Sequence, residues 1–332
     1  MRMSYTPDTW LLSAPPEALP ALRPLIQAHQ ERRPVRILVP SDNWQEQLED
    51  VAGVLVVGNR RHTPRTALPG PFVTSVAGRR VPAGWLPFSI LADLGCFANA
   101  AAEVQQRSGS GGPIALLGQL DDHVTRMIRR SVQILAGENG EPSIPVFWWT
   151  ADRIIRRDLL GALRIGLGVA MYCGHGRPYG WAGYHGLHSR HLAHAKGRPT
   201  GAMLSLTCHT ANRYRVALSF AEMIPLSGIA AAAFSAVRPT QTVDNWYWGI
   251  NICEVLSRNP ACSLGELILK ACPPRREQWR SYRIIGDPLA PLLSAPDAAQ
   301  ACAGIWAPAP DDSPIPPGYL SEFTDGYCSN SI

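Results

Sequence analysis

The sequence predicts an α/β protein built around a mostly parallel β-sheet. Two observations lead to this fold class. Short apolar runs bounded by turn residues alternate with segments of helical periodicity, which is typical of βαβ units with parallel strands. Apolar residues make up 46% of the 332-residue chain and charged residues only 17%, a composition that excludes a disordered protein and provides for a large buried core.

The first third of the chain shows the weaker part of this pattern. Residues 1–33 are rich in Pro, Arg and Ala around one short helical pattern (20–31), and we expect a leader packed on the surface. Residues 59–84 have no clear period, so we expect a loop that contains one short edge strand at most. A Gly- and Ser-rich linker, R-S-G-S-G-G-P (107–113), ends an N-terminal α/β half over 34–112. The elements expected in that half are strands at 35–40 and 51–58 and a helix at 90–103.

Beyond the linker the alternation becomes regular, and residues 113–294 are expected to form a second α/β region. The helix at 121–136 is typical: its apolar residues recur at helical spacing, and Asp121 and Asp122 supply a cap and a first-turn acid. The Pro- and Asp-rich residues 295–332 are expected to be an irregular tail. The expected strands lie at 114–118, 146–149, 169–175, 203–208, 228–237 and 282–285, and the helices at 121–136, 152–163, 213–223, 245–256 and 263–271.

Charge and cysteine content limit the expected partners and compartment. The net charge of +5 is spread over short basic stretches without a base-stacking motif, so we expect no nucleic-acid partner. The sequence has no signal-peptide core and no run of about 20 apolar residues, so we expect a cytoplasmic protein without membrane association. None of the eight cysteines falls in a C-x-x-C pair, so we expect reduced thiols, no structural zinc site and no cofactor.

Two reactive side chains end successive predicted strands. V-A-M-Y-C-G-H-G (169–176) leads to His175, and M-L-S-L-T-C (203–208) leads to Cys208. In an open α/β sheet both would project into the crevice beyond the carboxyl ends of the strands. Thiol catalysis requires a thiolate, a nearby base and donors for an oxyanion, and the backbone N–H groups of Gly176 and Cys208 would supply those donors. The helix expected after Cys208 would place the thiol near a helix N-terminus, which favours the thiolate.

Each of these residues alone has an ordinary explanation. A single cysteine at a strand end is more often a core residue than a nucleophile, and a single histidine in a loop is usually a surface group. Their occurrence at successive strand ends, with glycines on both sides of His175, favours catalysis. His209 directly follows Cys208 and is an alternative partner for the thiol.

Several short motifs lie in a characteristic order along the chain. A-M-Y-C-G-H-G (170–176) is followed by Trp181, and L-T-C-H-T-A occupies 206–211. Weaker motifs are V-L-V-V-G (54–58), L-L-G-Q-L (116–120), F-A-E-M (220–223), the apolar run at 228–235, S-L-G-E-L (263–267) and I-G-D-P (285–288). Together they resemble gingipain-like peptidases, which belong to the caspase-fold cysteine peptidases. The resemblance extends over residues 50–295 and is better after the linker than before it.

The resemblance implies a caspase-like three-layer sandwich in which helices flank a mostly parallel sheet of about six strands, with residues 113–294 as the catalytic domain. It also implies an endopeptidase with Cys208 as nucleophile, His175 as general base and leaving-group acid, and the backbone of Gly176 as an oxyanion donor. Two residues depart from the family pattern: Gln119 replaces an arginine, and His209 is unusual after the nucleophile. The caspase signature Q-A-C-x-G is absent, so the chain is not a close caspase.

The resemblance further implies a substrate pocket in the loop at 237–248, V-R-P-T-Q-T-V-D-N-W-Y-W. Asp244 would pair with a lysine or arginine before the scissile bond, and Trp246 or Trp248 would form a pocket wall. Two alternatives remain open: Asp244 caps the following helix, or Arg238 selects an acidic residue instead. The sequence leaves the substrate specificity open.

Four histidines, His185, His188, His191 and His194, recur at a spacing of three. On a helix this spacing brings neighbours together and would suit a zinc or nickel ion. No H-E-x-x-H motif or acidic ligand accompanies them, so we favour a solvated loop that shapes the cleft and expect no metal. The strand at 54–58 is followed by neither G-x-G-x-x-G nor a P-loop lysine, so no nucleotide site is expected.

The favoured hypothesis is a cysteine endopeptidase that cleaves a protein or peptide substrate, or itself, with a regulatory protein as a further partner. One alternative is a catalytically inactive caspase-fold module that binds or regulates other proteins. The other is a thiol-dependent acyltransferase or hydrolase that uses the same two residues.

Overall fold

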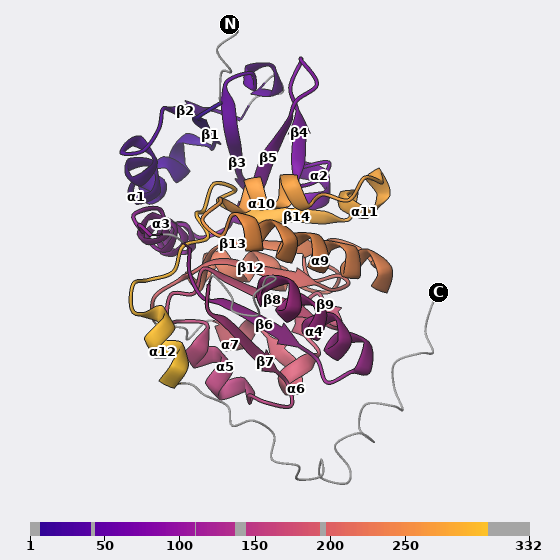
Figure 1. Ribbon diagram of the computed structural model, residues 1–332. Helices are drawn as coiled ribbons and strands as arrows, with labels where there is room; N and C mark the ends of the chain where they lie inside the picture. Colours follow the sequence, from indigo (N-terminus) through magenta and orange to yellow (C-terminus); the bar gives the residue numbers. More distant parts are fainter. Residues whose placement is uncertain (1–6, 41–43, 110, 137–143, 193–196, 305–332) are drawn as a thin grey trace, which may run out of the picture.

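The computed structural model describes residues 7–40, 44–109, 111–136, 144–192 and 197–304 (Figure 1). A single large sheet runs through the whole molecule, and helices cover both of its faces. Its ten successive strands are β2 (Val35–Leu38), β1 (Thr9–Ser13), β3 (Val51–Asn59), β5 (Arg80–Phe88), β14 (Tyr282–Gly286), β13 (Ala230–Ala236), β12 (Thr200–Leu206), β8 (Val169–Cys173), β6 (Ile114–Gly118) and β7 (Val146–Thr150). A short strand, β4 (Phe72–Thr74), pairs with β5 beside this path.

The sheet consists of two parallel blocks that run in opposite directions. In one block β13, β12, β8, β6 and β7 are parallel, and β14 pairs antiparallel with β13. In the other block β2, β1, β3 and β5 are parallel. The blocks meet where β14 pairs parallel with β5, through Ile284 opposite Gly84 and Ile285 opposite Trp85. The first block by itself has the six strands expected of a caspase-like sheet.

The expectation of about six strands for the whole sheet is therefore wrong, because the N-terminal half adds four more. Two of these strands, β5 and β1, were not predicted from the sequence. In β5, R-V-P-A-G-W-L-P-F, two prolines and a glycine mask the strand pattern, and proline is unusual inside a sheet. In β1 all five residues are buried and the strand lies between β2 and β3, so residues 9–33 are part of the sheet and its covering layer rather than a surface leader.

The helices form two layers around the sheet (Figure 1). One apolar core contains buried residues of α1 (Leu19–Gln30), α3 (Leu91–Gln105), α4 (Asp122–Ala136), α9 (Thr242–Arg258) and α10 (Leu264–Ala271). The core on the other face contains residues of α5 (Arg156–Ala162), α7 (Ser189–Leu192) and α8 (Phe220–Leu226). This arrangement is the expected three-layer sandwich.

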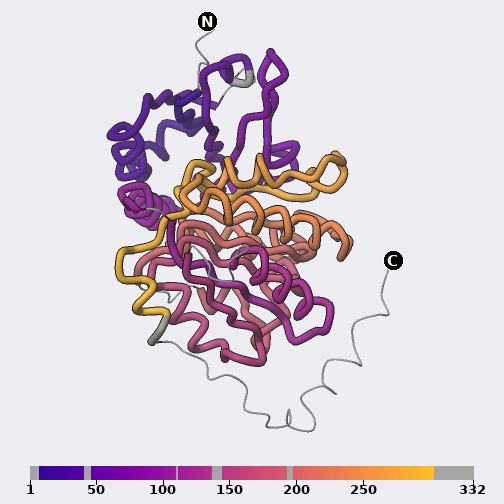
Figure 2. The backbone as a smooth tube through the Cα atoms, viewed as in Figure 1, coloured from indigo at the N-terminus to yellow at the C-terminus, as the bar shows by residue number. Residues whose placement is uncertain are grey.

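The remaining elements are a small separate sheet and several short helices. A separate three-stranded sheet, β9 (Gly176–Arg177), β10 (Gly180–Trp181) and β11 (Leu187–His188), follows β8, with α6 (Gly183–Gly186) between its last two strands. The remaining elements are η1 (Pro16–Ala18), η2 (Trp44–Gln47), α2 (Pro64–Ala67), α11 (Arg276–Arg280) and α12 (Ala298–Gly304). The backbone trace shows α12 (yellow) at the end of the described chain (Figure 2). Most of the expected tail, residues 305–332, lies outside the described residues.

Three further observations concern the linker, the cysteines and the described helices. The expected linker is anchored rather than detached, because the buried Arg107 donates to the carbonyl oxygens of Pro199 and Leu293. The seven described cysteines are free thiols, and Cys328 lies outside the described residues. None of the described helices has the length and apolar character needed to cross a membrane.

Candidate active site

The register of β8 and β12 places His175 and Cys208 at the same edge of the sheet. The last Cα pair of these parallel neighbours is Cys173 opposite Leu206. His175 and Cys208 each follow two residues beyond that pair, so both leave the sheet together at its carboxyl edge. The pairing of these two strands, expected from the sequence, is what the structure shows.

Gly176 makes the contact between the two segments close. A Cβ atom at this position would lie 2.2 Å from Oγ1 of Thr207 and 2.7 Å from the carbonyl oxygen of Cys208. Because no side chain fits there, the backbone after His175 packs directly against the backbone of Cys208. The two segments that carry His175 and Cys208 are therefore in close backbone contact at this edge of the sheet.

The backbone of His175 is held in place while its side chain remains exposed. Its N–H donates to Oε1 of Gln119 at 3.0 Å. Its carbonyl oxygen accepts from the N–H of Ala182 at 3.0 Å and from the hydroxyl of Tyr172 at 3.2 Å. Gln119, which departs from the family pattern, therefore supports the histidine segment directly, a role that sequence reasoning did not assign.

Cys208 is half-buried, and its sulfur contacts the loop that follows β13. The N–H of Thr240 donates to Sγ of Cys208 at 3.3 Å, and Oγ1 and the carbonyl oxygen of Thr240 each lie 3.5 Å from the same sulfur. These contacts fix the position of the thiol at the mouth of the loop expected to bind substrate. Thr240 is a second site residue that the sequence did not reveal, because the contact spans 32 positions.

The helix expected at 213–223 begins later than predicted. Residues 209–219 form turns and irregular chain, and α8 starts at Phe220 with Ser219 as its N-cap. Cys208 is therefore not next to a helix N-terminus, and the expected effect of a helix dipole on its thiol is wrong. The loop is fixed instead by the buried Glu222, which accepts from the guanidinium of Arg213 at 2.7 Å and from Nε1 of Trp85 at 3.1 Å.

His209 has its own partners in this loop. It adopts a left-handed backbone conformation with φ of 60°, and its Nδ1 lies 3.4 Å from the side-chain amide of Asn212. That amide also donates to the carbonyl oxygen of Val237 at 2.9 Å, so the loop side chains form a connected set. Burial lowers the pKa of His209, which favours the neutral ring at pH 7.

The three residues expected to form the substrate pocket have different environments. Trp248 is fully buried and packs edge-on against Phe234, so it is a core residue and its expected role as a pocket wall is wrong. Trp246 is half-buried against the same core. Asp244 is half-buried in the first turn of α9, where its Oδ1 accepts from the amide of Gln278 at 2.9 Å. The N-cap of α9 is Gln241, so Asp244 is not the helix cap.

The histidine series does not form a metal site within the described chain. No group of three or more His, Cys, Asp or Glu side chains among the described residues is arranged to hold a metal ion. His188 and His191 do contact each other, with rings stacked at a centroid distance of 5.5 Å. His185 is exposed, and His194 lies outside the described residues.

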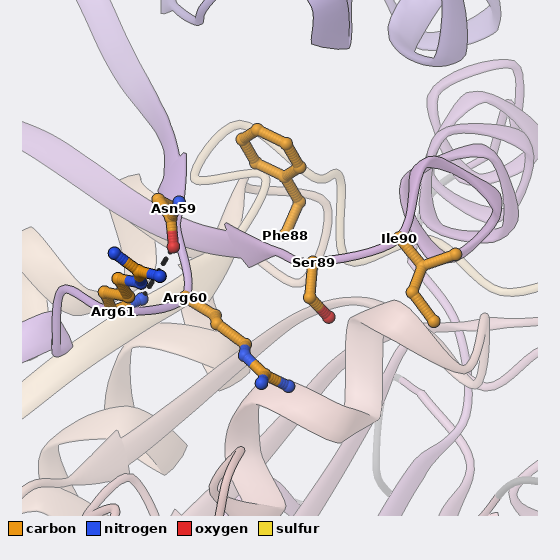
Figure 3. Close-up of a pocket in the computed structure, with 6 residues that line it drawn as sticks. All are labelled: Asn59, Arg60, Arg61, Phe88, Ser89 and Ile90. Carbon is orange, nitrogen blue, oxygen red and sulfur yellow. Dashed lines mark hydrogen bonds between the residues drawn. The ribbon is translucent and has the colours of Figure 1, made fainter.

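A hollow of about 440 Å³ lies elsewhere, at the ends of β3 and β5 (Figure 3). In this view the side chains of Arg60, Ser89 and Ile90 extend to one side of the chain and that of Phe88 to the other. The hollow contains neither His175 nor Cys208. The chemistry of the strand-end residues therefore identifies the candidate active site, and the shape of this hollow does not.

The comparisons with known proteins concern the fold and the family of the chain. Residues 139–293 match the model of peptidase family C25. A solved structure described only as a protease aligns with a TM-score of 0.66 and 14% identity, covering 86% of this chain and 78% of that one. The Arg-specific cysteine proteinase gingipain R (RgpB) aligns with a TM-score of 0.65 and 13% identity, covering 88% and 79%.

A more distant likeness is to the separase–securin complex of Saccharomyces cerevisiae, with a TM-score of 0.50 and 13% identity over 71% of this chain and 15% of that one. No curated protein sequence matches the chain. At these identities the solved structures show a shared fold. Residues 139–293 of the family match include His175 and Cys208, and together with the shared caspase-like fold this match supports a cysteine-type peptidase similar to the gingipains.

Proposed function

We propose that the protein is a cysteine endopeptidase that cleaves a protein substrate, or itself, with a His175–Cys208 dyad. The observation that carries the proposal is the register of β8 and β12, together with the packing of Gly176 against the backbone of Cys208. This arrangement brings a thiol, an imidazole and two backbone N–H groups to one edge of the sheet. Those are the parts that acyl transfer through a thiolate requires.

The reaction follows from these parts. His175 takes the thiol proton, and the sulfur of Cys208 attacks the peptide carbonyl carbon to form a tetrahedral oxyanion, which the N–H groups of Gly176 and Cys208 stabilise. The C–N bond then breaks, the amine leaves with the proton from His175, and an acyl-enzyme remains. Water, deprotonated by His175, attacks the thioester, and release of the carboxylic acid restores the thiol.

Alkylation tests this proposal with a control thiol in the same chain. The control thiol is Cys96, which is exposed on α3. Cys272 is a poorer control because burial raises its pKa to about 11. We expect iodoacetamide to label Cys208 at least about tenfold faster than Cys96, because His175 supplies the thiolate at neutral pH. Peptide cleavage should be lost in proportion to Cys208 labelling measured by peptide mass spectrometry. Equal labelling rates, or cleavage that survives full labelling of Cys208, would contradict the dyad.

Asp244 is the proposed acceptor for a basic residue before the scissile bond. Gln278 occupies its Oδ1, and Oδ2 makes no hydrogen bond with a described residue, so one carboxylate oxygen is open to a ligand. We expect Asp244→Asn to lower kcat/KM for arginine- and lysine-preceded peptides about tenfold or more and to leave aspartate-preceded peptides unchanged. Asp122→Asn, at an exposed position in the first turn of α4, is the matched control. Equal effects on all three peptides would remove Asp244 from the pocket.

A regulatory protein segment is part of the same proposal. A solved complex of the pro- and mature domains of Porphyromonas gingivalis RgpB aligns with a TM-score of 0.64 and 12% identity over 85% of this chain and 79% of that one. We propose that a protein segment likewise regulates access of substrates to the His175–Cys208 dyad of this chain.

A further inference from the structure

The small sheet β9–β11 is built directly on the segment that carries His175. β9 begins at Gly176, the residue after the histidine, and pairs with β10, which pairs with β11. The N–H of Ser189, at the start of α7, donates to the carbonyl oxygen of Tyr179 at 2.9 Å and ties α7 to the same sheet. Two strand spacings of about 5 Å separate β11 from β9, so the surface of β11 and α7 begins about 10 Å from the histidine segment.

This surface carries three arginines and two histidines. We call Arg156, Arg177, His188, Arg190 and His191 the basic cluster. Burial lowers the pKa of His188, and the positive charges of Arg190, Arg156 and Arg177 lower it further. Burial and the charges of Arg156, His188 and Arg190 lower the pKa of His191 in the same way. Among the described residues, no carboxylate forms an ion pair with Arg156, Arg190 or either histidine.

Contacts with neighbouring backbone and ring groups hold the basic cluster in place. The guanidinium of Arg156, on α5, donates to the carbonyl oxygens of His185 and Gly186 at 3.0 and 3.1 Å. The ring of His188 packs edge-on against Tyr179 at a centroid distance of 4.9 Å. The guanidinium of Arg156 and the ring of His188 are therefore fixed on an ordered surface.

Two hydrogen-bond donors in the cluster face each other. The backbone N–H of His188 donates to Nδ1 of His191 at 3.0 Å, so the neutral ring of His191 carries its proton on Nε2. That Nε2 lies 3.4 Å from Nε of Arg190, and a guanidinium nitrogen can only donate. A neutral imidazole accepts at only one nitrogen, so the two contacts cannot both be hydrogen bonds, and with the shorter one formed the side chains of Arg190 and His191 face each other as two donors. One anionic oxygen beside the pair would accept from both groups.

We propose that the basic cluster binds a carboxylate side chain of the peptide substrate about three residues from the scissile bond, so that substrates with Asp or Glu there are preferred. The spacing follows from the distance between β9 and β11, because an extended peptide advances about 3.3 Å per residue. The ligand is a side chain of the substrate because the cluster adjoins the proposed dyad. This inference rests on the proposed peptidase function for the identity of the ligand.

Binding to an inactive variant tests the inference without turnover. Two fluorescein-labelled dodecapeptides are compared, identical except that every glutamate of the first is glutamine in the second, and fluorescence anisotropy is measured on full-length Cys208→Ala protein. We expect the acidic peptide to bind about tenfold more tightly, because charge-assisted hydrogen bonds are about twice as strong as neutral ones. Adding Arg190→Gln and His191→Gln should abolish the difference.

The matched control is Arg157→Gln, which removes one positive charge from the same helix as Arg156. Arg157 is already paired with Asp158 at 2.9 Å, so this variant should keep the preference for the acidic peptide. In the active protein, Arg190→Gln with His191→Gln should raise KM for the acidic peptide and leave kcat unchanged, since neither group touches the reacting atoms.

Equal affinity for the two peptides, or a preference that survives Arg190→Gln with His191→Gln, would overturn the inference. An equal loss in Arg157→Gln would also overturn it, since net charge alone would then explain binding. Failure of the active protein to cleave any peptide would count against the proposed function. The anisotropy measurement on Cys208→Ala protein would still decide whether the basic cluster prefers acidic peptides.

Discussion

Replacing His175 with alanine should lower kcat/KM for peptide cleavage about 10³-fold, because a general acid and base contributes 10²- to 10⁴-fold in typical enzymes. His175 would be lost both as the group that removes the thiol proton and as the group that protonates the leaving amine. Its side chain is exposed, so the variant should unfold at the same temperature as the parent protein. Steady-state kinetics on one fluorogenic peptide, with Cys208→Ala as the floor, measures the loss.

His209→Ala is the control that separates the two histidines. The ring of His209 faces the amide of Asn212 at 3.4 Å, and burial lowers its pKa. Its removal should therefore cost far less activity than the removal of His175. If His209→Ala proves the more damaging change while both variants stay folded, His209 rather than His175 is the base and the assignment of the dyad is wrong.

The candidate site could be found from the sequence because its chemistry is local to strand ends. An apolar run that ends in a histidine and glycine, and a second that ends in a cysteine, mark a sheet edge without any knowledge of the third dimension. Gly176 is the clearest case. Its role depends only on the absence of a side chain, and the structure shows that a Cβ there would overlap the Cys208 segment.

The residues that the sequence did not reveal act through contacts between distant segments. Gln119 holds the backbone of His175 across 56 positions, and Thr240 contacts the sulfur of Cys208 across 32. Neither residue type is reactive, so nothing in its local pattern indicates a site. The prediction that Trp248 lines the pocket was wrong for a related reason. Trp248 lies on the buried face of α9 and packs into the core, although the loop before it is close to the site in sequence.

The fold likewise has a part that the local sequence pattern predicts and a part that depends on contacts between distant segments. The block from β6 to β14 follows the alternation of apolar runs and helical segments, and the order of strands and helices there was predicted. In the N-terminal block β2 and β3 were predicted as well, but β1 and β5 were not, because β5 contains two prolines and β1 is a short apolar run among prolines and arginines. Their strand conformation is imposed by neighbours in the sheet, and β-propensity depends strongly on such packing.

One buried polar cluster fastens these two blocks together, and its loss should have the largest effect on stability. Asp287 follows β14 and is fully buried. Its Oδ2 accepts from Nε2 of Gln105, on α3, at 2.7 Å and lies 3.1 Å from Nε2 of His29, on α1. The ring of His29 stacks on Trp10 of β1 at a centroid distance of 3.9 Å. The cluster thus connects β14 to three elements of the N-terminal half.

We expect Asp287→Ala to lower the free energy of unfolding by about 3 kcal/mol, because it removes a buried carboxylate to which buried groups hydrogen-bond. The side chains of His29 and Gln105 would be left buried without their acceptor. Denaturant unfolding at pH 7 measures the change. Asp158→Ala removes an exposed carboxylate paired with Arg157 and should have little effect. A small effect of Asp287→Ala would show that the two blocks are held together mainly by apolar packing.

The same cluster should make the protein sensitive to acid. Burial raises the pKa of Asp287, but the attraction and hydrogen bond of His29 and the hydrogen bonds of Gln105 and Leu289 outweigh burial and leave the pKa below its ordinary value. The unfolded chain then takes up the proton first, so the stabilisation is complete above about pH 4 and is lost as pH falls through the lower, folded-state pKa. In Asp287→Asn the fall in unfolding free energy below pH 4 should be shallower than in the parent protein. If both proteins lose stability equally over that range, the acid sensitivity originates in other carboxylates.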